Sequence, residues 1–173
     1  MRGMMKLSAA LIIAGSLILM ACSAAEDKLE STIYVLTDQG QGKAVGTVVV
    51  EPTAEGALFR VNVKSPELLK AGTTHPFHVH EFGDLSATTD EGGNVIAGGA
   101  AGGHWDPENT GKHAGPDGDG HRGDLPSLPV NEQAEIDTEV VAKRIKNISE
   151  LKGKALIIHV TDGPDRIFGA VFK

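Results

Sequence analysis

Seven short runs rich in β-branched residues divide this chain, and this pattern constrains the fold more than any other feature of the sequence. Val, Ile and Thr favour strands, and the Gly-containing turns between the runs favour reversals of direction. The runs cover residues 31–36, 44–51, 57–63, 74–80, 136–142, 155–160 and 167–172. They predict one all-β domain, an antiparallel sandwich or barrel. Residues 143–151 fit either one helical turn or a loop.

A long segment without periodic apolar residues separates the fourth run from the fifth. Residues 82–129 are rich in Gly, and they hold three of the chain's seven His. A loop of this length in a compact domain is normally functional or disordered. Because disorder predicts scattered polar residues, the grouping of His indicates a functional loop.

The N-terminus has the pattern of an export signal. Arg2 and Lys6 precede an apolar run over residues 7–20, which is short for a membrane span. The run ends in Leu-Met-Ala-Cys at residues 19–22, which resembles the lipobox of bacterial lipoproteins, where the Cys is lipidated and becomes the first mature residue. An ordinary secretory signal with a chance Cys is the alternative interpretation, and in both cases the domain is exported.

These signals predict a signal peptide over residues 1–21, a tether over 22–30 and one domain over 31–173, held at the cell envelope by a lipid on Cys22 and facing the periplasm. Removing residues 1–21 takes away two positive charges and no acid, which moves the formal charge from −7 to about −9. Such a protein will not seek nucleic acid or anionic lipid by electrostatic attraction. Cys22 is the only Cys, so an intramolecular disulfide is excluded and a metal is the expected staple.

Two histidines in the fourth run are spaced to meet one ion. Side chains alternate across a strand, so His78 and His80 point to the same face. The pattern also occurs by chance. A single His inside an apolar run, such as His159, is more often a satisfied core residue than a ligand.

The long loop adds a second group of possible ligands, which are His104, His113, His121 and Asp124. Three imidazoles and one carboxylate match the number and types of ligands of a tetrahedral zinc site. Gly and Pro between them allow the backbone to fold back so that they converge. The alternative is an acidic loop rich in turns that holds His by accident.

Four segments together resemble the signature and the zinc loop of bacterial copper/zinc superoxide dismutases: HPFHVHEFGD (75–84), GHWDP (103–107), KHAGP (112–116) and GHRGDLP (120–126). The likeness extends over about residues 31–173. It implies a Greek-key β-sandwich or barrel of the immunoglobulin-like, superoxide dismutase type. It also implies one copper and one zinc per chain, and the dismutation of superoxide to oxygen and hydrogen peroxide. Nothing in the sequence indicates the oligomeric state.

The same resemblance assigns the site residues. It gives copper to His78, His80, His104 and His159. It gives zinc to His104, His113, His121 and Asp124, so that His104 bridges both ions and passes a proton to the product. His75 becomes a structural residue near the copper strand. Arg166 becomes the cation that guides the superoxide anion, although a lone Arg at a strand start is otherwise a surface residue.

Two departures from the family pattern stand out. Only residues 160–165 separate His159 from Arg166, where the family has a much longer loop that walls the copper channel and supplies an Asp that links a copper His to a zinc His. We therefore expect a more open copper site, with Asp162 or Asp165 in place of that Asp. Gly169 stands near the position of a Cys that forms the family's disulfide.

Two other functions fit part of this pattern. A non-enzymatic copper-binding or copper-delivery lipoprotein on the same fold is favoured by the short channel loop. A structural domain stapled by zinc alone would not need the copper-side histidines. The complete ligand set and Arg166 favour the enzyme.

Overall fold

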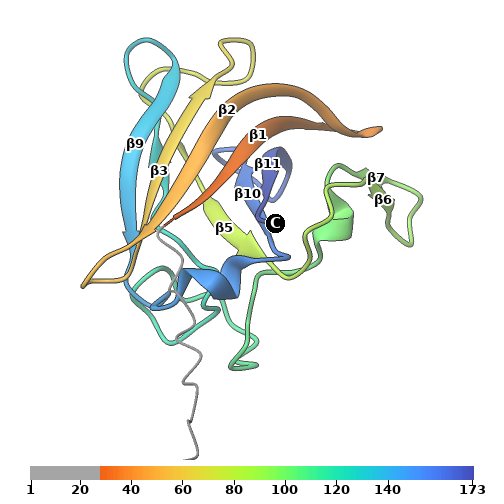
Figure 1. Ribbon diagram of the computed structural model, residues 1–173. Coiled ribbons are helices and arrows are strands. Elements are labelled where there is room, and N and C mark those ends of the chain that lie inside the picture. The colour runs from red at the N-terminus through yellow and green to blue at the C-terminus, as the bar shows by residue number, and fades with distance from the viewer. Residues whose placement is uncertain (1–27) are drawn as a thin grey trace, which may run out of the picture.

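The computed structural model describes residues 28–173, which form a strongly curled antiparallel sheet (Figure 1). Its seven strands follow the order β5-β10-β11-β1-β2-β3-β9. They are β1 Leu29–Thr37, β2 Gly40–Pro52, β3 Ala57–Lys64, β5 Phe77–His80, β9 Glu135–Ala142, β10 Ala155–His159 and β11 Arg166–Val171. Two small pairs join β4 Thr74–His75 to β8 Leu128–Pro129 and β6 Thr88–Thr89 to β7 Val95–Ile96.

The remaining regular structure consists of two 3₁₀ turns, η1 Gly99–Ala101 and η2 Ile148–Leu151. The second turn lies in the segment that the sequence left open between a helical turn and a loop. The side chain of Asn147 caps it by accepting a hydrogen bond from the backbone N–H of Ser149. The described residues contain no helix that is long and apolar enough to span a membrane.

All seven predicted strands are present and every pairing is antiparallel, so the all-β prediction is confirmed. The predicted strand over residues 74–80 is divided at Pro76, which has no N–H to donate to a ladder. Strand β1 begins at Leu29, two residues inside the predicted tether. The predicted signal peptide and Cys22 lie outside the described residues.

The main core fills the inside of the curled sheet. Along β3 the side chains of Phe59, Val61 and Val63 are buried, while alternate residues face outward. The ring of Phe59 meets that of Phe77 edge-on, with centroids 5.8 Å apart. Ile158 on β10 is buried in the same cluster. The strands β5 and β10, which carry His78, His80 and His159, are therefore anchored by apolar packing.

A second apolar cluster fixes the start of the long loop against the sheet. It consists of Leu36, Leu85, Ala101, Ala155 and Ile157. A Cβ at Gly169 would lie 2.8 Å from Cδ2 of Leu85, so Gly169 leaves the space that Leu85 fills. Apolar packing between this loop and β11 thus occurs at the position where the resemblance placed a disulfide.

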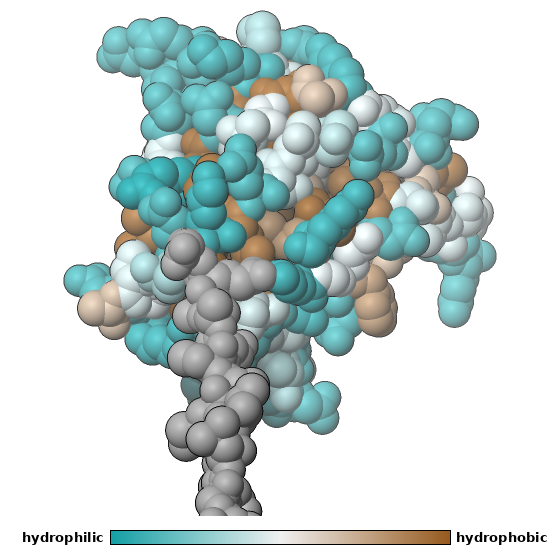
Figure 2. Space-filling model, in the orientation of Figure 1, coloured by the Kyte–Doolittle hydropathy of each residue, from teal (hydrophilic) through white to brown (hydrophobic). Residues whose placement is uncertain are grey.

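Hydrophilic residues cover most of the face shown in Figure 2, with hydrophobic residues gathered between them. An open cavity of about 830 Å³ lies among β1, β2 and residues 83–86. None of the seven histidines lines this cavity. The chemistry-bearing side chains gather instead at β5, β10 and the long loop.

Candidate metal centre

The sheet register brings the histidines of β5 and β10 together. These strands are antiparallel neighbours, with His80 opposite Ala155 and His78 opposite Ile157. The long loop is attached to β5 by two isolated bridges, His80 to His104 and His78 to Asp124. Backbone pairing thus places two of the loop's candidate ligands, His104 and Asp124, beside candidate ligands of the strand.

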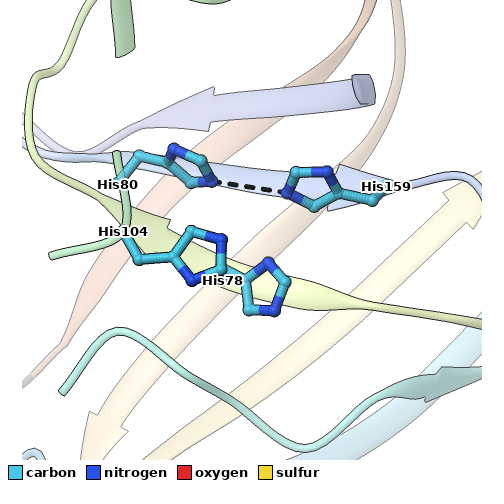
Figure 3. Close-up of side chains that lie close together, drawn as sticks. All are labelled: His78, His80, His104 and His159. Carbon is cyan, nitrogen blue, oxygen red and sulfur yellow. Dashed lines mark hydrogen bonds between the residues drawn. The ribbon is translucent and has the colours of Figure 1, made fainter. Parts of the chain in front are cut away.

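One cluster contains the four proposed copper ligands, His78, His80, His104 and His159 (Figure 3). One ring nitrogen from each lies within 4.8 Å of the others. The rings of His78 and His104 stack with centroids 3.9 Å apart. Four imidazoles that converge from two strands and a loop form a nitrogen-rich site of the kind that suits Cu(II).

The hydrogen bonds of two rings fix their tautomers. Nδ1 of His80 lies 2.9 Å from the carbonyl oxygen of Gly102, and Nδ1 of His159 lies 2.8 Å from that of Pro164. Because a carbonyl oxygen only accepts, each Nδ1 carries the proton and each Nε2 is left with a lone pair. These two Nε2 atoms face each other at 3.4 Å (Figure 3). Two lone pairs at this distance fit one shared cation at bond lengths of about 2.0 Å.

Burial keeps these imidazoles neutral. It lowers the pKa of His78 to about 2, that of His80 to about 3 and that of His159 to about 4. Burial also lowers the pKa of His104. Nδ1 of His78 is buried without a hydrogen-bond partner. At neutral pH the cluster therefore offers unprotonated nitrogen donors, as a metal ion requires.

The second group converges on one carboxylate oxygen. Oδ1 of Asp124 lies 2.9 Å from Nδ1 of His104, 3.0 Å from Nδ1 of His113 and 3.4 Å from Nδ1 of His121. Donors around zinc at bond lengths of about 2.0 Å stand about 3.3 Å apart in a tetrahedron, and these three distances from Asp124 are close to that value. The other oxygen of Asp124 accepts the backbone N–H of Ala114 at 3.1 Å, which orients the carboxylate.

Four residues on this side have ligand atoms that all lie within 4.8 Å of one another, and they are His78, His104, His113 and Asp124. His78 enters this group because its ring stacks on His104. His121 is not in this group, but its Nδ1 is buried without a hydrogen-bond partner and lies 3.4 Å from Oδ1 of Asp124. His75 lies outside both groups, and its Nδ1 donates to the carbonyl oxygen of His159 at 2.7 Å, as a structural residue would.

Arg166 stands next to the first cluster. It opposes His159 in the ladder between β10 and β11. Its guanidinium donates to the carbonyl oxygens of Gly98 at 2.5 Å and Gly102 at 2.7 Å. Burial lowers the pKa of Arg166, but a guanidinium remains protonated at neutral pH. Two of its five N–H donors are used by these carbonyls.

The short connection between His159 and Arg166 does not expose the copper-side rings. The exposed fractions of His78, His80 and His159 are 8, 0 and 6%. The turn folds back over His159, since Pro164 accepts its Nδ1 proton and Val160 donates to Asp165 at 2.9 Å. The ring that faces solvent is His113, whose side chain is 56% exposed.

Neither proposed substitute for the family's linking Asp makes such a link. In the described part of the chain, the carboxylates of Asp162 and Asp165 form no hydrogen bond to a ligand histidine. Burial lowers the pKa of His159, and the negative charge of the nearby Asp165 offsets part of this effect. The two metal groups are instead connected by His104 itself.

Sequence reasoning missed the carbonyl groups that orient the rings. The carbonyl oxygen of Gly102 accepts hydrogen bonds from both His80 and Arg166. Gly102 has φ +75° and ψ −155°, a conformation open only to Gly. The Gly-Gly pair at residues 102–103 marked this position in the sequence. No comparable signal marked Pro164, because a backbone acceptor depends on how the turn folds.

Known proteins resemble this chain in both sequence and fold. A family model for copper/zinc superoxide dismutase (SODC) matches residues 44–166. The chain is 44% identical to the Cu-Zn superoxide dismutase 2 of Salmonella typhimurium over 145 residues, 82% of this chain and 80% of the relative. It is 40% identical to the Cu-Zn superoxide dismutase of Brucella abortus over 164 residues, 92% of each chain. The solved structure of the Cu/Zn superoxide dismutase from Brucella abortus superposes with a TM-score of 0.76 and 35% identity, covering 84% of this chain and 99% of that one.

Proposed function

The chain belongs to the copper/zinc superoxide dismutase family and dismutes superoxide to oxygen and hydrogen peroxide, and we propose which of its residues carry this activity and where in the cell it acts. Copper is held by His78, His80, His104 and His159. Zinc is held by His104, His113, His121 and Asp124. The enzyme acts at the bacterial cell envelope, where it removes superoxide outside the cytoplasm.

The observation that carries this assignment is the double membership of His104. It is the loop residue that belongs both to the four-histidine cluster and to the group around Asp124. Its Nδ1 faces Asp124, which leaves Nε2 for the copper side. A ring shared by two sites can give up both nitrogen protons only between two cations, so the geometry supports a paired copper and zinc centre.

The residues around the centre bind the metal ions and fix the direction of the ligand rings. Bound copper supplies one-electron chemistry, because it alternates between two oxidation states. His80 and His159 keep their Nε2 lone pairs aimed at one point, since carbonyl groups hold their Nδ1 protons. His104 is oriented by Asp124, and its Nε2 is the atom that can hold a proton for the peroxide product. The guanidinium of Arg166 bonds the same Gly102 carbonyl group as His80, so its positive charge lies beside these rings and attracts the superoxide anion.

Replacement of Arg166 tests its guiding role. R166A should lower kcat/KM at least about tenfold at low ionic strength, because a local cation on a strongly acidic protein concentrates an anionic substrate. The rate of the wild type should fall as salt is added, and that of the variant should fall less. R60A removes the same charge from β3, in the other half of the sheet, and serves as the matched control. Equal rates and equal salt dependence in R166A and R60A would contradict the role.

The proposed location rests on the lipobox-like motif at Cys22 and on the negative charge of the exported domain. A protein with a formal charge of about −9 has no electrostatic attraction to anionic lipid, so a lipid on Cys22 would be its means of staying at the membrane. Wild-type protein should sediment with membranes and incorporate a labelled fatty acid. C22S should do neither. A wild-type protein that is unlabelled and soluble after export would instead indicate an ordinary secretory signal.

A copper-delivery protein on the same fold is the second candidate. The six-residue connection at residues 160–165 favours it, since it lacks the length of a channel wall. A delivery protein would release copper to an acceptor and would not turn over superoxide. The buried state of His78, His80 and His159 favours the enzyme, because a delivery site must open to hand over its ion.

A further inference from the structure

The connection between β9 and η2 carries an arginine that binds the metal loop through the loop's backbone. Nη2 of Arg144 donates to the carbonyl oxygen of Gly120 at 2.8 Å, and Nη1 donates to that of His121 at 2.9 Å. Within residues 28–173, Arg144 forms no ion pair with a carboxylate. Both of its hydrogen bonds therefore hold loop backbone, in a segment far from it in sequence.

The position of Arg144 is itself well fixed. Strand β9 ends at Ala142, which is paired with Ala57 and buried. The backbone N–H of Ile145 donates to the carbonyl oxygen of Ala142 at 3.1 Å, and the side chain of Ile145 is fully buried. The guanidinium thus extends from a rigid corner of the domain toward the loop.

The contact reaches two of the proposed zinc ligands. The carbonyl oxygen of His121 accepts the Arg144 guanidinium and also the backbone N–H of Asp124, at 3.3 Å. The backbone N–H of His121 donates to the carbonyl oxygen of Lys112 at 2.8 Å. Lys112 precedes His113 in the chain. Arg144 consequently attaches to the sandwich the part of the loop in which backbone hydrogen bonds join His121 to Lys112 and to Asp124.

The charge of Arg144 also acts on carboxylates of this loop. The pKa of Glu108 is lowered mainly by its hydrogen bond to Arg122 and that of Asp119 mainly by its hydrogen bond to Lys112, and the charge of Arg144 adds to both shifts. Toward a divalent cation the same charge is unfavourable, because of Coulomb repulsion. What Arg144 offers the zinc site is therefore its geometry, since one planar fork holds two successive carbonyl groups at once.

We propose that Arg144 is a positioning residue for the zinc ion, which fixes the backbone of His121, and through it Asp124, before the ion binds. The inference rests on the zinc ligands assigned under the proposed function. Without this contact the loop must be ordered when the ion binds, which weakens binding. Loss of residues that orient metal ligands typically lowers metal affinity by about 10- to 100-fold.

The test is a titration of the metal-free protein with Co²⁺, whose visible absorption reports tetrahedral coordination, against a competing chelator. R144M should bind Co²⁺ at least about tenfold more weakly than the wild type. R144K should be intermediate, because an ammonium group lacks the planar fork. K143M is the matched control, since Lys143 pairs with the exposed Asp117 of the same loop at 3.1 Å, and it should bind like the wild type. Copper affinity of the four-histidine cluster should be similar in all four proteins.

Three results would overturn the inference. Co²⁺ affinity of R144M equal to that of the wild type would show that the contact does not position the ligand. Equal losses of cobalt and copper affinity, with a lower melting temperature of the metal-free protein, would show a general structural role. Absence of a tetrahedral cobalt spectrum in the wild type itself would contradict the zinc assignment on which the inference rests. Should R144M not fold, the comparison of R144K with K143M decides the question.

Discussion

Removal of both metal ions is expected to lower the melting temperature of the protein by about 10 °C or more. The ions bind the folded chain, and a ligand at a concentration about a thousandfold above its Kd stabilises that chain by about 4 kcal/mol. For a domain of this size, each kcal/mol shifts the melting temperature by about 2–4 °C. The effect should be large here because Cys22 is the only Cys, so a disulfide within the chain cannot replace the ions.

Without the ions, this arrangement of side chains would bring together groups that repel one another. The Nε2 lone pairs of His80 and His159 face each other at 3.4 Å, and Nδ1 of His78 and of His121 are buried without partners. Thermal unfolding followed by circular dichroism, before and after chelation, measures the effect. Zinc alone should restore part of the loss and zinc with copper the whole. Equal melting temperatures for the metal-free and the reconstituted protein would contradict the metals' structural role.

His159→Ala is expected to lower superoxide consumption at least about a hundredfold, because even residues that only orient a metal ligand contribute about 10- to 100-fold. His159 is at the end of β10, while the zinc-side residues lie in the long loop. The variant should therefore lose copper and keep zinc. Metal content per chain and the rate of superoxide consumption are both measured.

The reciprocal variant is His121→Ala, which should lose zinc and keep copper. If His159→Ala keeps its copper and its rate, His159 is not a copper ligand. If each variant loses both metals, the two sites are not separable and the assignment of ligands to two ions fails.

The strands and the composition of the site could be predicted from the sequence because both depend on local rules. Strand alternation alone places His78 and His80 on one side of β5, and the structure has both rings in one cluster. His159 could not be identified from its own run, since an apolar strand with one His is equally a core strand. Its role becomes apparent only from the register of β10 beside β5.

The rest of the site depends on where distant backbone groups meet. The carbonyl groups of Gly102 and Pro164 set the tautomers of His80 and His159, and those of Gly120 and His121 receive Arg144. Apart from the Gly-Gly pair at residues 102–103, side-chain identity gives no sign of these acceptors. The prediction of a more open copper site took loop length as a measure of exposure. In the structure the short turn folds over His159 and buries it.

The measurement that tests the central claim most directly is superoxide consumption by the purified protein, carrying one zinc per chain, at copper contents up to one per chain. The account predicts rapid consumption in proportion to bound copper, which disappears on chelation and returns on reconstitution. Tight binding of copper without turnover would contradict it, and would make the protein a copper-handling member of the same fold.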